Sequence, residues 1–156
     1  MKKVMAAVLS ILAVALTFFF FLGKNKAPPL LLLKDAESGK VFASYELPQG
    51  EFGVSFIHSV NKTQVLETYK VEGNEIYLEG CIYYSFGAGV AEELPEDWEL
   101  KLGEDGEMII SNIHKKIERL SYFVGTVSDH ILHIEGKEWS LRELCGRNTN
   151  LLFELG

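Results

Sequence analysis

Residues 52–71 read FGVSFIHSVNKTQVLETYKV, and this stretch decides the fold class of the chain. Two runs rich in Val, Phe, Ile and Tyr flank a polar loop near residues 60–63. Such a pattern is typical of two β-strands joined by a short connection. The segment therefore predicts a strand over 52–58 and a returning strand over 64–71.

The same pattern continues through the rest of the chain after residue 26. Short apolar or alternating runs follow one another at spacings of about 8 to 12 residues, with Gly, Asn, Asp or Pro between them. The predicted strands cover residues 30–34, 40–46, 52–58, 64–71, 75–85, 98–102, 108–110, 117–127, 130–135 and 150–155. A helical turn is expected only near residues 140–146, where a capping box and a glycine stop occur. The sequence predicts an all-β domain, either an antiparallel β-sandwich or a partly open barrel.

The amino terminus predicts a membrane segment. The uncharged run from Val4 to Leu22 would span about 28 Å as a helix, close to the hydrocarbon thickness of a bilayer. We therefore expect residues 1–26 to form a transmembrane signal-anchor helix with its flank, and residues 27–156 to form the β domain. A cleavable signal peptide, with cleavage after Ala13-Val14-Ala15 and secretion of the domain, is the alternative.

Charge is distributed unevenly along the chain. The net charge is −7, from 15 basic and 22 acidic residues, but four lysines lie in residues 1–26 and every acidic residue lies at Asp35 or later. Residues 27–156 thus carry 11 basic and 22 acidic side chains, a net charge of −11. Such a domain repels phosphate groups, which argues against binding to nucleic acid or to anionic lipid headgroups.

The lysines beside the apolar run lean toward a cytoplasmic amino terminus, with the C-terminal domain outside the cytoplasm. Disulfides persist in that environment. Cys81 and Cys145 are the only cysteines and can form one bridge; two separate buried thiols are the alternative.

A polar pair stands out on the apolar face of residues 52–71. A connecting loop with an even number of residues puts His58 and Glu67 on the same inward face of the hairpin. A carboxylate removed from water needs a partner, and His58 is the nearest candidate. The pair is either a binding or catalytic site at the mouth of the domain or a structural hydrogen bond. Ser59 points to the other face, which disfavours a Ser-His nucleophile.

Two further features complete the candidate site. Gly87 and Gly89, on either side of Ala88 and after Phe86, permit either a close backbone approach to a ligand or a tight turn. His130 opens a strand on an apolar face and is a candidate third member beside His58. His133 lies on the opposite face of that strand, so these two histidines do not jointly chelate a metal in regular β geometry. No metal or cofactor is predicted.

These motifs resemble a family of small exported bacterial proteins, the domain of unknown function family numbered 1850. The resemblance runs from Leu30 to Leu155 and is carried by Phe56-Ile57-His58-Ser59-Val60, by Ser85-Phe86-Gly87-Ala88-Gly89 and by Val127-Ser128-Asp129-His130. The resemblance marks seven motif positions as candidate functional residues but assigns none of them a role: His58, Ser59, Glu67, Phe86, Gly87, Gly89 and His130. Members are often encoded beside components of TAXI-type TRAP transporters.

Anchor, β pattern and resemblance together predict a membrane-anchored extracytoplasmic binding or accessory module for a TRAP-type transporter. Its partners would be transporter subunits or a small organic solute. One alternative is a small enzyme that uses His58 and Glu67 as an acid–base pair. The other is a purely structural envelope protein.

Overall fold

A computed structural model describes residues 27–59, 62–84 and 94–156. The predicted anchor over residues 4–22 and the motif residues Phe86, Gly87 and Gly89 lie outside the described residues. In the part that is described, no helix has the length and apolar character needed to cross a membrane.

The described residues form twelve strands and one short helix. The bounds are β1 Leu30–Asp35, β2 Val41–Glu46, β3 Glu51–Ile57, β4 Gln64–Glu72, β5 Glu75–Tyr83, β6 Glu99–Leu102, β7 Met108–Ser111, β8 Lys115–Ile117, β9 Leu120–Val124, β10 His130–Ile134, β11 Lys137–Ser140, α2 Leu141–Cys145 and β12 Thr149–Leu155. The all-β prediction is confirmed, and each predicted run coincides with a strand. The run predicted over 117–127 is divided between β8 and β9, because the chain crosses there from one sheet to the other.

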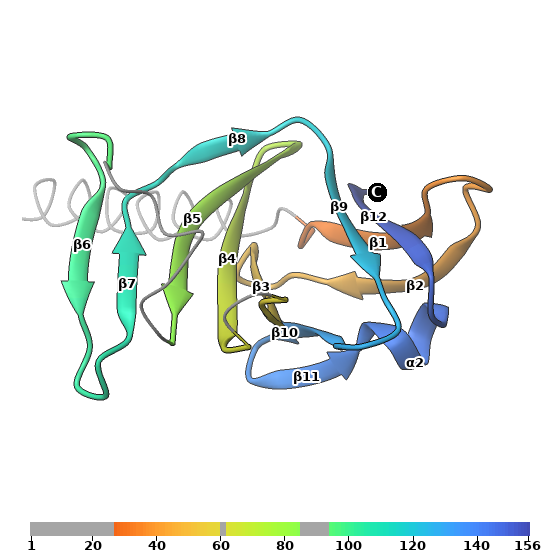
Figure 1. The fold of residues 1–156 in the computed structure, drawn as a ribbon. Helices are drawn as coiled ribbons and strands as arrows, with labels where there is room; N and C mark the ends of the chain where they lie inside the picture. Colours follow the sequence, from red (N-terminus) through yellow and green to blue (C-terminus); the bar gives the residue numbers. More distant parts are fainter. Residues whose placement is uncertain (1–26, 60–61, 85–93) are drawn as a thin grey trace, which may run out of the picture.

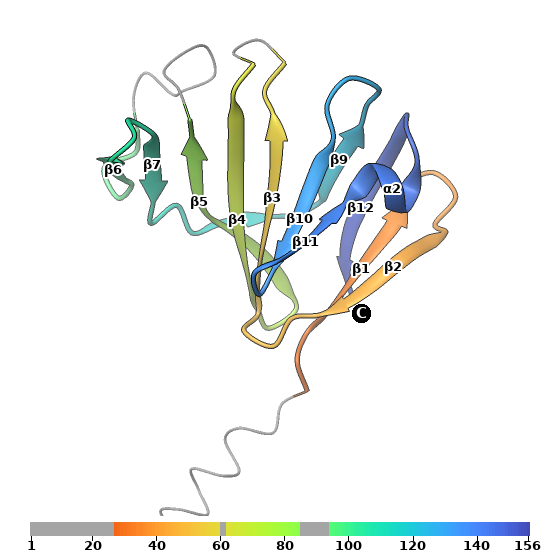
Figure 2. The same cartoon turned by 90° about the horizontal axis from the view of Figure 1, so that it is seen from below.

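Two open antiparallel sheets pack against each other (Figures 1 and 2). The smaller sheet has the order β2-β1-β12-β9, and the larger has the order β11-β10-β3-β4-β5-β7-β6. Two strands share one edge of β5: β7 pairs with its residues 81–83 and β8 pairs with its residues 76–78. Among the described strands there is no closed barrel. The prediction of antiparallel β-sheets is confirmed.

The hairpin of β3 and β4 has the even-numbered loop on which the placement of Glu67 depended. Val54 pairs with Glu67 and Phe56 pairs with Val65, so the loop is even and Glu67 lies on the inward face. Between the sheets, apolar side chains from both form the main core, including Leu31, Leu33, Phe52, Val54, Leu132, Leu151 and Phe153. Burying each such side chain contributes about 1.5–3 kcal/mol relative to leaving it exposed.

The short helix follows its predicted capping signals. The Ser140 side chain accepts a hydrogen bond from the backbone N–H of Glu143, and the N–H of Gly146, at φ 84°, donates to the Arg142 carbonyl. This caps both ends of α2, which packs against β10, β11 and β2.

Of the two alternatives for the cysteines, the structure has the separate thiols, because Cys81 and Cys145 are both free. Cys81 lies on β5 in a second apolar cluster with Val65 and Ile110, whereas Cys145 lies on α2 at the margin of the main core. The Cys145 thiol donates instead to the Leu141 carbonyl at 3.0 Å.

The domain has two distinct ends. At the base, backbone hydrogen bonds join Leu47 to Pro29 and Val71 to Gly50, and Gly156 bonds to Leu30, so both ends of the described domain meet there. The opposite end, called the motif end below, comprises residues 57–59, 62–64, 84 and 127–130. Figure 2 shows the turns after β3 and after β9 together at this end, away from the described amino terminus.

Candidate functional site

Glu67 is held by two tyrosines from different sheets. Its carboxylate accepts a hydrogen bond from the Tyr69 hydroxyl at 3.0 Å and a short one from the hydroxyl of Tyr122. The two hydroxyl oxygens lie 2.6 Å apart. Tyr69 belongs to β4 and Tyr122 to β9, so this polar cluster joins the larger sheet to the smaller one.

Burial is the main cause that raises the pKa of both phenols, and the charge of Glu67 raises the pKa of each further. Both hydroxyls therefore stay protonated at neutral pH and remain hydrogen-bond donors. A carboxylate between the sheets is stabilised by such donors, since its desolvation is otherwise costly.

His58 lies on the same face as Glu67 but not beside it. The His58 N–H donates to the Thr63 carbonyl, which sets residue 58 opposite residue 63. Glu67 is four residues farther along the returning strand, a separation of about 13 Å. The partner role that the sequence assigned to His58 is filled by the two phenols, because the even-loop rule fixes the face and not the distance. His58 is half-buried at the motif end, and Ser59 after it is exposed.

His130 lies beside the cluster. It pairs with Phe56, and its ring centroid lies 5.3 Å from that of Phe56 and 5.4 Å from that of Tyr122. Burial lowers the pKa of His130; the charge of Asp129 opposes this shift and that of Arg142 adds to it. Its Nδ1 atom is buried and has no hydrogen-bond partner in the described part of the chain.

Asp129 connects His130 to the short helix. One carboxylate oxygen accepts the backbone N–H groups of His130 at 2.7 Å and Arg142 at 3.1 Å, and the other accepts the Ser140 hydroxyl at 2.5 Å. The turn before β10 is thereby tied to the start of α2. The Nε and Nη2 atoms of Arg142 are also buried and, within the described residues, have no hydrogen-bond partner.

Sequence reasoning missed Tyr122 and Arg142. Tyr122 lies in a run that resembles any core strand, and nothing in its spacing indicates contact with a residue more than fifty positions earlier. Arg142 lies inside the capping box, where a charged side chain is ordinarily solvated. The one signal in the sequence was Asp129, an acidic residue eleven positions before the capping box that contains Arg142.

The other face of the larger sheet carries a separate polar group. As predicted, His133 points away from His130, and its ring nitrogens lie 2.8 Å from the Ser55 hydroxyl and 3.4 Å from the Glu138 carboxylate. His133 lines a cavity of about 570 Å³ together with Gly53, Thr68 and Glu79. Ser55 is only 2% exposed and does not line that cavity, so its hydroxyl fixes the imidazole rather than acting as a nucleophile.

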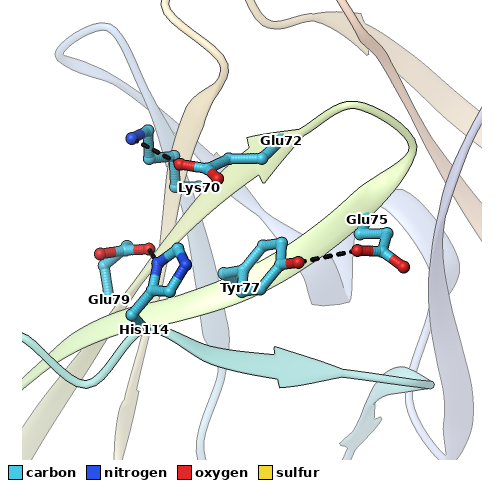
Figure 3. Close-up of polar contacts among 6 residues, drawn as sticks. All are labelled: Lys70, Glu72, Glu75, Tyr77, Glu79 and His114. Carbon is cyan, nitrogen blue, oxygen red and sulfur yellow. Dashed lines mark hydrogen bonds and ion pairs between the residues drawn. The ribbon is translucent and has the colours of Figure 1, made fainter.

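Figure 3 shows the outer surface of the β4–β5 hairpin. Lys70 pairs with Glu72 at 2.8 Å, His114 pairs with Glu79 at 2.7 Å, and the Tyr77 hydroxyl donates to Glu75 at 2.7 Å. These groups are partly exposed, and such surface contacts contribute little to stability. Over the described residues, no group of three or more His, Cys, Asp or Glu side chains could hold a metal ion.

A comparison with protein families matches residues 52–141, more than half of the chain, to the domain of unknown function DUF1850. The chain belongs to the DUF1850 family. The DUF1850 match begins in β3 and ends at the first residue of α2, so it includes the Glu67 cluster, Asp129 and His130 and stops one residue before Arg142. No curated protein and no solved structure gives a significant match to the chain.

Proposed function

We propose that this DUF1850 protein is a membrane-anchored extracytoplasmic binding module that assists a TRAP-type transporter of the TAXI class. It meets its partner or solute through the motif end. The observation that carries the proposal is a set of exposed apolar side chains there: Ile57 is 43% exposed, Tyr84 47% and Val127 89%.

These side chains belong to neighbouring strand ends. Ile57 pairs with Gln64, the Tyr84 N–H donates to the Gln64 carbonyl, and Val127 lies in the turn just before β10, which pairs with β3. Three of the seven large apolar side chains that are exposed on the described residues thus lie at the motif end of a strongly acidic domain. Such a group favours a contact surface, because contact removes the apolar side chains from water.

The arrangement of the two ends supports this role. Residues 1–26 precede the base, so an anchor there would hold the motif end away from the bilayer. The seven residues of β3 span about 23 Å along the domain. The motif end would then face a partner subunit outside the membrane rather than the lipid surface. The acid–base alternative receives no comparable support, since Glu67 is bonded to two phenols and lies well away from His58 along the strands.

The test is purification of the full-length protein from its native membrane after crosslinking in cells, followed by mass spectrometry. We expect a TRAP transporter subunit with the wild type and its loss with the double variant Ile57→Ser, Val127→Ser. Val41→Ser is the matched control, because Val41 is 48% exposed on β2, the edge strand of the smaller sheet.

Absence of any transporter subunit from the wild-type preparation would refute the transporter role. Retention of the subunit by the double variant would refute contact through the motif end. Loss with Val41→Ser as well would show that removing exposed apolar side chains anywhere on the domain, not at this end in particular, weakens the association.

A further inference from the structure

Arg142 presents an unusual pair of donors. Its Nε and Nη2 atoms are both buried, and neither has a hydrogen-bond partner within the described residues. These two atoms lie on one edge of the guanidinium plane, where their N–H groups form a fork that matches the two oxygens of a carboxylate. A buried positive charge with unsatisfied donors is costly unless an anion pairs with it.

The acidic side chain that accepts the Arg142 backbone N–H, Asp129, is already engaged. Asp129 accepts three hydrogen bonds, from the backbone N–H groups of His130 and Arg142 and from the Ser140 hydroxyl. It therefore positions the backbones of the two residues whose side chains lack partners. The anion that matches the guanidinium fork has to come from outside this group of residues.

His130 supplies a third unpaired donor, on a residue whose backbone N–H bonds to the same Asp129 oxygen as the backbone N–H of Arg142. Its buried Nδ1 has no partner in the described chain, and the Arg142 charge acts on its ring. Because burial holds the imidazole neutral at pH 7, its Nδ1–H tautomer can donate a hydrogen bond without adding a second positive charge beside the guanidinium.

We infer that Arg142 and His130 bind the carboxylate group of a small organic acid at the motif end. This assignment rests on the proposed binding role of that end and names the class of solute. Arg142 donates side-on to the two carboxylate oxygens through Nε–H and Nη2–H, and His130 donates to one of them from Nδ1. Because these nitrogens are covered, binding requires the side chains over them to move.

The chain offers a direct readout, because it has only three arginines: Arg119, Arg142 and Arg147. In the full-length protein in detergent, acetate and then succinate are titrated while the arginine Nε–H signals are followed by nitrogen-15 NMR. We expect a saturable shift of the Arg142 signal and none for the other two. Chloride and sulfate at equal ionic strength serve as anion controls and should leave the signal unchanged.

Variants then separate the fork from the charge. Arg142→Lys keeps the positive charge but loses the bidentate geometry, and we expect at least tenfold weaker binding of the better of the two acids. Arg147→Lys, at an exposed site five positions away, is the matched control and should bind as the wild type does. His130→Phe keeps the packing against Phe56 and Tyr122 and should weaken binding severalfold.

No shift of the Arg142 signal with either acid, an equal shift of all three arginines, or an equal response to sulfate would overturn the carboxylate site. The wild-type titration gives this answer even if a variant fails to fold. If no acid binds while the transporter subunit still co-purifies, the site is refuted and the docking role stands. If an acid binds and no subunit co-purifies, the transporter role is the part that fails.

Discussion

The cluster around Glu67 allows a test in which the chain supplies its own control. Tyr69 and Tyr77 each donate a hydrogen bond to a glutamate two residues earlier on the same strand, Glu67 and Glu75. In the first pair Tyr69 is buried and Glu67 is half-buried between the sheets, whereas the second pair lies at the surface (Figure 3). Tyr69→Phe and Tyr77→Phe remove the same atom in two environments.

The two substitutions remove hydrogen bonds of different strength. Tyr69→Phe removes the hydroxyl that donates to the Glu67 carboxylate. A hydrogen bond to a charged group contributes about 1.5–3 kcal/mol, so the free energy of unfolding should fall by about that amount. Tyr77→Phe should change the free energy of unfolding much less than Tyr69→Phe does, because Glu75 keeps its ion pair with Lys116 at 2.6 Å and the site is open to water.

Urea unfolding of the full-length protein at pH 7, followed by tryptophan fluorescence and circular dichroism, measures both variants. At about 3 °C per kcal/mol for a domain of this size, Tyr69→Phe should also lower Tm by about 5–9 °C. Equal losses for the two variants, or a loss below about 1 kcal/mol for Tyr69→Phe, would refute the claim that the phenols stabilise the Glu67 carboxylate between the sheets.

Three shorter predictions concern His130, the thiols and one glycine. The folded state lowers the pKa of His130, so the unfolded chain binds more protons between that pKa and about 6.5. The free energy of unfolding should therefore fall as the pH drops below about 7. His130→Phe should flatten this pH dependence in urea titrations from pH 7.5 to 5. Thiol titration of the unreduced, denatured protein should find two free sulfhydryls, and in the native state Cys145 should react before Cys81, whose pKa burial raises to about 11. Gly80→Ala should destabilise the domain by about 1–3 kcal/mol in the same urea assay, because its Cβ would lie 3.0 Å from the Ile110 carbonyl oxygen.

The local alternation of apolar and polar residues was sufficient to predict most of the strands. Alternation in residues 52–71 predicted both strands of the central hairpin and the face of Glu67, since period-2 patterning and loop parity are properties of the chain itself. One strand was missed, β11. It follows a two-residue turn at Glu135 and Gly136, both with positive φ, and an acidic residue followed by glycine between apolar runs is weaker than the Asn-Gly or Asp-Gly signal for such a hairpin.

Contacts between the sheets could not be predicted in the same way. The residues that complete the site come from β9 and α2, and their distance from Glu67 depends on how the two sheets pack. Tyr122 reaches Glu67 across 55 positions in sequence, and Arg142 approaches His130 only because Asp129 joins two separate turns. Neither contact can be predicted from hydrophobic periodicity, because periodicity indicates which face of a strand a residue lies on and not which side chain of the other sheet it meets.

The polar groups at this side of the core differ in how completely they are satisfied. Glu67 has two phenol donors and Asp129 has three donors, so both can be understood as structural: one joins the sheets and the other fixes the start of α2. Buried polar groups in folded proteins are almost always paired, and an unpaired one is retained at a cost in stability. Asp129 holds the backbones of Arg142 and His130, and among the described residues it is the side chains of these two that have buried nitrogens without a hydrogen-bond partner. This bonded framework holds the unpaired donors in place, so folding meets the cost of orienting them, and the ligand has only to displace the side chains that cover them.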